Sequence, residues 1–262
     1  RILFRKINKV ISKNIIYMTS NFIAMWSGPR NVSTALMRSF ENRSDCFVSD
    51  EPFYSYFLYK TGLKHPLSDE IIKSGLIDYN KIIKYITGPI PFSKNIWYQK
   101  HMAHHILEGV NMDWIKNIEN CLLIRHPSDV ILSYSKKNEI DNIQQLGYLQ
   151  QIEIYKMLTE ETGVSPIIID AQDLLKEPRK ILIEICKNLR IKFDDKMLSW
   201  PPGIRKTDGI WGKHWYKQVE ASIGFNPYIE TDRTIPSRYQ NLNDECMKHY
   251  DFLFQNRIIL NN

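Results

Sequence analysis

The sequence predicts an α/β fold with three layers, in which helices cover both faces of a mainly parallel five-stranded sheet. Short apolar runs alternate along the chain with segments of helical periodicity, which is the pattern of βαβ units. The first apolar run ends in a Gly-Pro-Arg-Asn turn, residues 28–31, that opens into a helical pattern. The chain has 262 residues, of which 43% are hydrophobic, so it can bury the core of one large domain.

Each element of this fold has a local signal. Apolar runs bounded by polar or turn residues predict strands at 22–26, 46–49, 95–100, 120–125 and 166–170. Periodic apolar positions predict helices at 33–43, 102–118, 127–137, 141–162 and 178–190, and a last helix near 237–255. Residues 61–94 contain six Gly and Pro residues, so we expect short helices broken by loops and a candidate lid there.

The start of the chain differs in composition from the rest. Residues 1–17 carry basic side chains and no acidic ones, and Met18 stands just before the first predicted strand. A transit peptide is one explanation for such a segment. We favour the alternative that residues 1–19 are a leader or cloning-derived segment outside the fold, followed by a single domain at 20–262.

Composition narrows the classes of function. The net charge of +6 suits an anionic ligand, although it is equally compatible with biased codon usage. No compact basic run with interleaved aromatic residues is present, so we expect no nucleic acid partner. The four cysteines stand far apart without a C-x-x-C pair, and no apolar run reaches the roughly 20 residues that span a membrane. We therefore predict a soluble, cytoplasmic protein without a membrane partner; a homodimer stays open.

The first strand-to-helix junction is typical of a phosphate site. Its turn and first helical positions are Gly28, Pro29, Arg30, Asn31, Val32, Ser33 and Thr34. A helix N-terminus favours anions through its free N–H groups and its dipole. The second glycine and the lysine of an ATP-binding Walker loop are both missing, which argues against an ordinary kinase. Alternatively, Ser33 or Thr34 simply caps the helix.

A second junction repeats this arrangement about a hundred residues later. Arg125 ends the fourth predicted strand, Pro127 suits a first helical turn, and Ser133 lies two helical turns further on. A guanidinium and a hydroxyl brought together there would bind a second phosphate. Alternatively, Asp129 pairs with a nearby base and Arg125 forms a structural ion pair.

Together the two junctions resemble the sulfotransferase family. R-H-P-S-D-V-I-L-S, residues 125–133, matches the family motif R-x-P-x-D-x-x-x-S, and W-S-G-P-R-N-V-S-T-A-L-M-R-S-F, from residue 26, is similar to bacterial members; the resemblance covers residues 20 to about 255. It implies a P-loop-like fold and the donor 3′-phosphoadenosine 5′-phosphosulfate (PAPS). The loop at 28–34 would then hold the 5′-phosphosulfate, and Arg125 with Ser133 the 3′-phosphate. Arg30 takes the place of the family's loop lysine and would stabilise the leaving phosphate.

A third segment is similar to the family's late R-K-G…G-x-W stretch, which closes over the nucleotide. The matching basic pair is Arg205 and Lys206, while Thr207 stands where the family has glycine. By resemblance, both basic residues would contact the nucleotide. Without the family, two prolines, a basic pair and two tryptophans still indicate a loop that faces a ligand, or else a packed surface loop.

Two residues are candidates for the base that takes the acceptor's proton. Glu51 follows the second strand, and carbohydrate and protein-tyrosine sulfotransferases use a glutamate in this region. His101 follows the third strand, where cytosolic members have a K-T-H segment, and Lys100 would be its lysine. On a helix, His101 and His105 would also share a face as metal ligands, but the Glu of H-E-x-x-H and a third ligand are missing, so no metal is expected.

These observations predict a PAPS-dependent sulfotransferase. It would transfer the sulfuryl group to a hydroxyl, or less favourably an amine, of a small-molecule acceptor and release 3′-phosphoadenosine 5′-phosphate (PAP). Two alternatives remain: a nucleotide-dependent phosphotransferase on the same type of sheet, and a non-catalytic nucleotide-binding protein.

Overall fold

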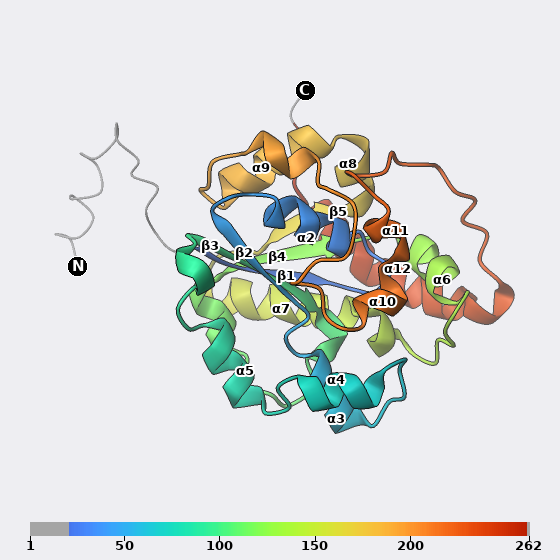
Figure 1. The fold of residues 1–262 in the computed structure, drawn as a ribbon. Helices are drawn as coiled ribbons and strands as arrows, with labels where there is room; N and C mark the ends of the chain where they lie inside the picture. Colours follow the sequence, from blue (N-terminus) through green and yellow to red (C-terminus); the bar gives the residue numbers. More distant parts are fainter. Residues whose placement is uncertain (1–20, 261–262) are drawn as a thin grey trace.

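Five strands form one sheet in the order β2-β3-β1-β4-β5, and every pairing is parallel (Figure 1). They are β1 (Asn21–Ser27), β2 (Cys46–Asp50), β3 (Ile96–Met102), β4 (Glu119–Ile124) and β5 (Ile167–Asp170). The structure is a computed structural model that describes residues 21–260, so the leader predicted at 1–19 lies outside the described residues. The predicted α/β fold with a five-stranded parallel sheet is confirmed.

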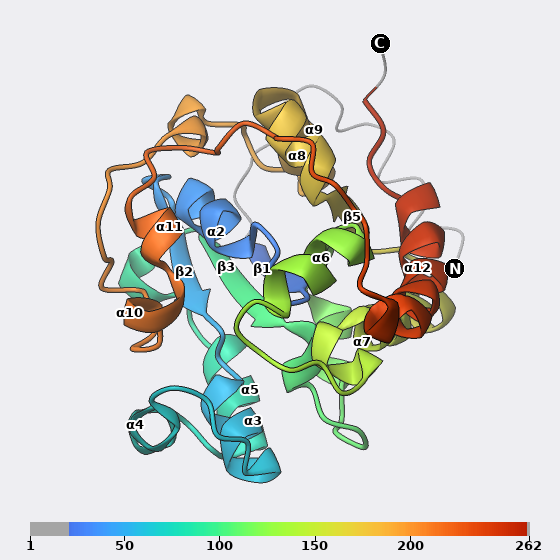
Figure 2. The same ribbon diagram turned by 90° about the vertical axis from the view of Figure 1, so that its right-hand side faces the viewer.

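Helices cover both faces of the sheet (Figures 1 and 2). One face packs against α2 (Ser33–Glu41), α8 (Ala171–Lys176) and α9 (Pro178–Asn188). The other packs against α5 (Tyr79–Ile86), α6 (Pro127–Tyr134), α7 (Tyr148–Thr162) and α12 (Gln240–Gln255). Alternate residues of each strand supply the two cores, which is why the strands are apolar almost throughout. For example, Met25 and Leu123 lie in the first core, and Trp26 and Leu122 in the second.

Shorter elements complete the described chain. They are α3 (Tyr54–Thr61), α4 (Ser68–Ser74), η1 (Pro91–Ser93), η4 (Ile143–Leu146), η5 (Asp195–Leu198), α10 (Gly212–Trp215), α11 (Lys217–Glu220) and η6 (Ser237–Tyr239).

The helix predicted at 102–118 is wrong. β3 runs on to Met102, and only two 3-10 turns follow, η2 (Ala103–His105) and η3 (Asp113–Asn117). Gly109 between them has φ of +80°, which interrupts a right-handed helix. The apolar residues that suggested a helix face, among them Ile106 and Val110, instead line a cavity. The proposed helical spacing of His101 and His105 as metal ligands is therefore also wrong, because His101 lies on a strand and His105 on a 3-10 turn.

The carboxyl ends of β1 and β4 form the switch point of the sheet. The chain leaves β1 toward β2 on one side and leaves β4 toward β5 on the other. In open α/β sheets the ligand crevice lies at such a point. Ser27 pairs in register with Leu123, so the residues that follow β1 and β4 begin side by side.

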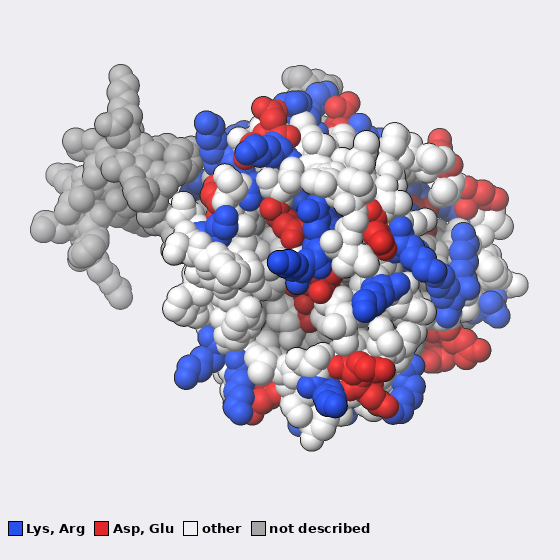
Figure 3. All heavy atoms as spheres, in the orientation of Figure 1, with Lys and Arg blue, Asp and Glu red and all other residues white. Residues whose placement is uncertain are grey.

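The distribution of surface charges and the state of the cysteines do not mark a particular site. Basic and acidic side chains are interspersed over the face in Figure 3, which has a recess near its centre. All four cysteines are buried and free of disulfides. Within residues 21–260, no helix combines the length and the apolar character needed to cross a bilayer.

Candidate active site

The loop after β1 presents free backbone donors at the start of α2. The first intrahelical hydrogen bond runs from Leu36 N to Val32 O, so the N–H groups of Ser33, Thr34 and Ala35 precede it. Val32 occupies the N-cap position, and no side chain caps the helix. The alternative in which Ser33 or Thr34 serves as the cap therefore does not describe this helix end. Asn31 adds an amide that donates to Leu123 O of β4, at 3.1 Å, while its Oδ1 is buried without a partner among the described residues.

The two predicted phosphate sites meet directly. Arg30 Nε donates to Ser133 Oγ at 2.9 Å, and Arg125 Nη1 donates to the carbonyl oxygen of Arg30 at 2.6 Å. Arg30 has φ of +57°, an uncommon conformation for a non-glycine residue, and this turn brings its side chain across toward α6. Arg30 and Ser133, about a hundred residues apart in the sequence, are thus in contact at the switch point of the sheet.

The positive charge of this junction is only partly neutralised by carboxylates. Burial, and then the charge of Arg125, lower the pKa of Arg30. Among the described residues, no carboxylate forms an ion pair with Arg30. Asp129 is 4.0 Å from Arg125 Nε, but its closer partner is Arg233, at 3.0 Å. Arg233 is therefore the nearby base that was predicted to pair with Asp129. Because Asp129 is mainly engaged by Arg233, Arg30 and Arg125 are suited to bind an anion.

Close packing at Gly28 fixes where the loop lies. A Cβ added to Gly28 would stand 2.3 Å from Leu146 O. A Cβ added to Gly147, which has φ of +80°, would stand 3.2 Å from Gly28 Cα. The backbones of the loop and of the η4–α7 junction therefore touch. Only glycine at position 28 permits this approach.

Glu51 belongs to a buried charged cluster at the ends of β2 and β3. Lys100 Nζ lies 2.5 Å from Glu51 Oε1, 2.9 Å from Asp50 Oδ1 and 2.7 Å from the Tyr216 hydroxyl. Tyr216 in turn donates to Asp50 at 2.8 Å. Asp50 pairs in register with Lys100, so adjacent parallel strands end with opposite charges side by side. Glu51 therefore pairs with Lys100.

Burial controls the protonation of this cluster. It raises the pKa of Glu51, against the opposing charge of Lys100. Burial alone would lower the pKa of Lys100, but Asp50 and Glu51 outweigh it and raise that pKa well above its usual value. The ammonium therefore persists at neutral pH, next to a carboxylate that binds a proton more readily than an exposed one. Glu51 also has φ of +44°, an uncommon conformation of the kind that occurs at functional sites.

His101 faces the opposite side of the sheet from Lys100. Its ring stacks on Trp26 with 4.4 Å between centroids, its Nε2 is 3.2 Å from Gln99 Oε1, and it is 1% exposed. Neighbouring residues of a strand point to opposite faces, so Lys100 and His101 cannot share one. Burial lowers the pKa of His101 to about 3. The structure thus places His101 within the core and does not bring it together with Glu51.

The late basic segment lies against α2 and β2 (Figure 2). Tyr216 joins it to the charged cluster, and Gly209 N donates to Asp50 Oδ2 at 3.1 Å. Arg205, however, donates to Pro201 O at 2.7 Å and lies 3.8 Å from Glu41, while Lys206 is exposed. Neither is brought to Arg30 by a described contact. Asp50 and Tyr216 were not predicted as site residues. The opposite charges of Asp50 and Lys100, at the ends of two strands, are the signal in the sequence that could have indicated the cluster.

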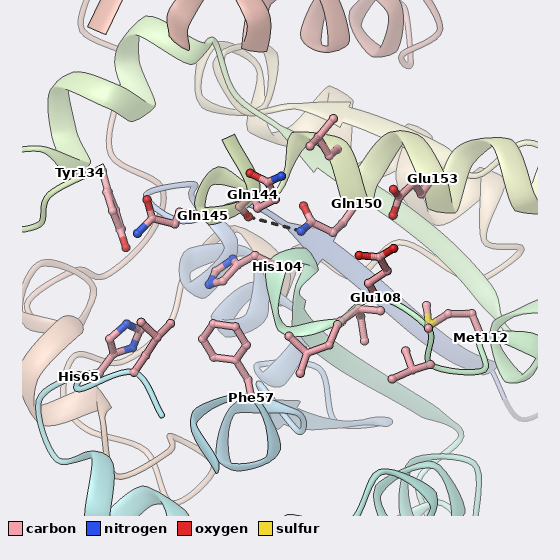
Figure 4. Close-up of a pocket in the computed structure, with 16 residues that line it drawn as sticks. Phe57, His65, His104, Glu108, Met112, Tyr134, Gln144, Gln145, Gln150 and Glu153 are labelled. Carbon is pink, nitrogen blue, oxygen red and sulfur yellow. Dashed lines mark hydrogen bonds between the residues drawn. The ribbon is translucent and has the colours of Figure 1, made fainter. Parts of the chain in front are cut away.

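A cavity of about 630 Å³ lies on the other side of the η4–α7 junction (Figure 4). Gly147 lies between the cavity and the loop, because a Cβ added there would stand 3.2 Å from Gly28 Cα and 3.7 Å from the backbone nitrogen of His104. Phe53, Trp97 and Tyr98 are buried in the core and do not line this cavity. The lining includes Phe57, His65, His104, Ile106, Leu107, Glu108, Tyr134, Gln144, Gln145, Gln150 and Glu153.

Comparison with known proteins identifies the fold and the family. The sequence matches the family described as "Sulfotransferase domain" over residues 21–251. Two Arabidopsis thaliana proteins, named branched-chain-amino-acid aminotransferase-like protein 2 and protein 1, are 33% and 34% identical to it over 88% of this chain. The chain spans about two fifths, 41%, of the length of these relatives.

Solved structures agree with this match. The fold is similar to the sulfotransferase domain of the olefin synthase from Synechococcus PCC 7002, with a TM-score of 0.57, 16% identity and coverage of 91% of this chain and 98% of that one. It is also similar to a sulfotransferase from Alicyclobacillus acidocaldarius, with a TM-score of 0.52, 9% identity and coverage of 92% and 97%. Since the family match extends over nearly all of the described residues, the chain belongs to the sulfotransferase family.

Proposed function

We propose that the protein transfers the sulfuryl group of PAPS to a hydroxyl, or less favourably an amine, of a small-molecule acceptor and releases PAP. The observation that carries this proposal is the contact of the two anion-binding junctions, Arg30 to Ser133 and Arg125 to the Arg30 carbonyl. PAPS has phosphate groups at both its 5′ and 3′ ends. Two adjacent cationic sites at the switch point suit a nucleotide of this kind.

The residues that would hold PAPS are those of the two junctions. The N–H groups at the start of α2 and Arg30 would bind the 5′-phosphosulfate, and Arg125 with Ser133 the 3′-phosphate. Arg205 and Lys206 would reach the nucleotide only after a rearrangement of their segment, because Arg205 is engaged by Pro201 and Glu41.

The reaction requires a proton acceptor and charge stabilisation. The acceptor oxygen forms a bond to sulfur while the bond from sulfur to the bridging phosphate oxygen breaks. In this proposal Glu51 takes the hydroxyl proton, and Arg30 stabilises the charge that develops on the leaving phosphate. His101 is the less favoured base because its ring is enclosed by Trp26 and the core.

Two measurements test the proposal. Calorimetry should show that PAP binds more tightly than ATP or AMP, and a preference for ATP would favour a phosphotransferase instead. Incubation with PAPS carrying radioactive sulfur and a metabolite extract should label an acceptor in a time-dependent manner. Binding of PAP without any labelled product across diverse extracts would favour the non-catalytic alternative.

A further inference from the structure

The cavity beside the phosphate loop has two chemically different ends. Tyr134 and His65 lie toward one end in Figure 4, Glu108 and Glu153 toward the other, and His104 between them. Ile106, Leu107, Val110, Met112 and Leu149 make much of the wall apolar. A volume of about 630 Å³ is within the range of small-molecule sites, roughly 300–1,000 Å³.

The Tyr134 end adjoins the proposed transfer site. Tyr134 follows Ser133, whose hydroxyl accepts from Arg30. His65 Nδ1 lies 2.8 Å from the hydroxyl of Tyr54, at the start of the helix that follows Glu51. An acceptor hydroxyl that reaches the sulfuryl group must therefore enter from this end.

The opposite end carries negative charge without a basic counterpart. Among the described residues that line the cavity, two are glutamates and none is lysine or arginine. Burial, with a contribution from His65, lowers the pKa of His104 to about 3, so the middle of the cavity is neutral. An anionic acceptor would meet only repulsion here, whereas a cation would be attracted.

Two buried polar atoms of residues that line the cavity have no hydrogen-bond partner in the described part of the chain. His104 Nδ1 and Gln150 Oε1 are inaccessible to solvent and have no hydrogen-bond partner within the described chain. Unpaired buried groups of this kind are uncommon in native proteins. They would become partners for a polar group of the acceptor only if the two side chains rotate into the cavity, whereas the surrounding wall suits an apolar stem.

We propose that this cavity selects an elongated amphipathic acceptor with a hydroxyl at the Tyr134 end, an apolar stem, and a protonated amine at the Glu108–Glu153 end. The inference rests on the proposed function for the assignment of the transferred group. The selection of a cation over an anion depends only on the cavity. Specificity arises from both the attractive carboxylates and the repulsion of acidic acceptors.

The test compares 8-aminooctan-1-ol with 8-hydroxyoctanoic acid, which match in length and hydroxyl group but differ in the charge of the far end. Binding of each to the protein saturated with PAP is measured by calorimetry at low salt. We expect the amine to bind at least about tenfold more tightly, and the ratio to shrink as salt rises. Equal affinity, tighter binding of the acid, or no binding of either probe at millimolar concentration would overturn the inference.

Two variants test whether Glu108 and Glu153 cause the preference for the amine. Glu108→Gln combined with Glu153→Gln should bring the two affinities within about twofold of each other. Glu160→Gln, an exposed glutamate of the same helix α7 that does not line the cavity, should keep the full ratio. A double variant that retains the preference would overturn the inference, provided that its thermal midpoint matches the wild type.

The two proposals fail in different ways. If PAP does not bind, the proposed function falls, and the same probes applied to the free protein still decide the charge preference. If PAP binds and sulfur is transferred but the acid competes as well as the amine, the function stands and the acceptor class is wrong.

Discussion

At the scale of single residues, the candidate site is defined by which cations have carboxylate partners and which do not. Lys100 is enclosed by Asp50 and Glu51, so its charge is already balanced. Arg30 has Ser133 and the nearby Arg125 as neighbours instead. This contrast is the reason why we propose proton transfer at the cluster of Glu51 and anion binding at Arg30 and Arg125.

Arg125→Ala should remove most of the discrimination between PAP and AMP, which differ only in the 3′-phosphate. A charge-assisted hydrogen bond contributes about 1.5–3 kcal/mol, so the ratio of the two dissociation constants should fall by roughly 10- to 100-fold. Calorimetry with both nucleotides measures that ratio directly. Arg179→Ala, at a partly exposed arginine paired with Asp195, is the control. A variant at position 125 that still prefers PAP as the wild type does would refute the assignment.

Glu51→Gln should lower turnover by roughly 10²- to 10⁴-fold, the usual loss on removal of a general base. Affinity for PAP should change little, because Glu51 contacts Lys100 and Tyr216 and not the phosphate loop. The glutamine retains a hydrogen-bond acceptor for Lys100, which limits structural damage. Steady-state rates together with calorimetry separate the two effects, and wild-type turnover would transfer the base role to His101.

The pH profile provides an independent test of Glu51. Its pKa is raised above the ordinary 4.5, mainly by burial. A base must be unprotonated, so turnover should be full above this raised pKa and fall as the pH drops through it. The acid limb of the rate profile should therefore lie above pH 4.5 in the wild type and be absent from the residual rate of Glu51→Gln. An acid limb that persists unchanged in the variant would assign it to another group.

At the scale of elements, the site depends on where loops touch. The loop after β1 rests on the junction of η4 and α7, and the late segment is joined to β2 through Tyr216 and Asp50. These contacts place the anion site, the charged cluster and the cavity around one edge of the sheet. Both of these contacts are made by loop residues or single side chains, so the position of each loop depends on a few individual residues.

Gly28→Ala tests the first junction. The added methyl would stand 2.3 Å from Leu146 O, so one of the two backbones must move. Such overpacking typically costs about 1–3 kcal/mol, and the moved loop should also lose affinity for PAP. Urea unfolding and calorimetry measure the two effects. Gly163→Ala, at φ of +71° with no neighbour within 4 Å of the new methyl, should lose stability from backbone strain alone and keep PAP affinity. Normal affinity in Gly28→Ala would show that the junction does not position the loop.

The sequence predicted the elements whose signals are local. Strand runs, the turn at 28–31 and the spacing from Arg125 to Ser133 depend on neighbouring residues, and the strands lie within two residues of their predicted ends. The failure at 102–118 has a physical cause, because apolar residues that line a cavity can show the same periodicity as a helix face. The Asp50–Lys100–Tyr216 cluster was beyond local reasoning, since its members are separated by up to 166 residues and meet only through strand pairing.

At the scale of the whole molecule, the sheet order brings the two phosphate junctions together. β1 and β4 are neighbours although 91 residues, 28–118, lie between the end of β1 and the start of β4, and helices leave them toward opposite sides. The alternation of apolar runs with helical segments predicted a parallel sheet but not this order, which depends on which strand faces fit together. The same burial that builds the two cores also encloses His101 and His105, and it covers part of His104 at the cavity wall.

Those histidines should make the fold sensitive to acid. Burial lowers the pKa of His101 and of His104 to about 3, and the pKa of His105 well below its usual value. In the unfolded chain each titrates near pH 6.5, so between about pH 3 and 6.5 the unfolded state binds more protons. The stability from these neutral rings is therefore complete above about pH 6.5 and is lost as the pH falls, by up to about 1.4 kcal/mol per pH unit for each histidine.

His101→Gln should flatten this dependence by about one proton. Urea unfolding at several values between pH 5 and 7 gives the slope of unfolding free energy against pH, which is a better readout than absolute stability because loss of the stacking on Trp26 also weakens the variant. His214→Gln, at an exposed position, controls for removal of one histidine. An unchanged slope in His101→Gln would mean that this ring binds protons equally in the folded and unfolded states. The enclosure of the ring between Trp26, Phe53 and Trp114 opposes this outcome. A charged imidazolium there would have neither solvent nor a carboxylate to compensate its charge.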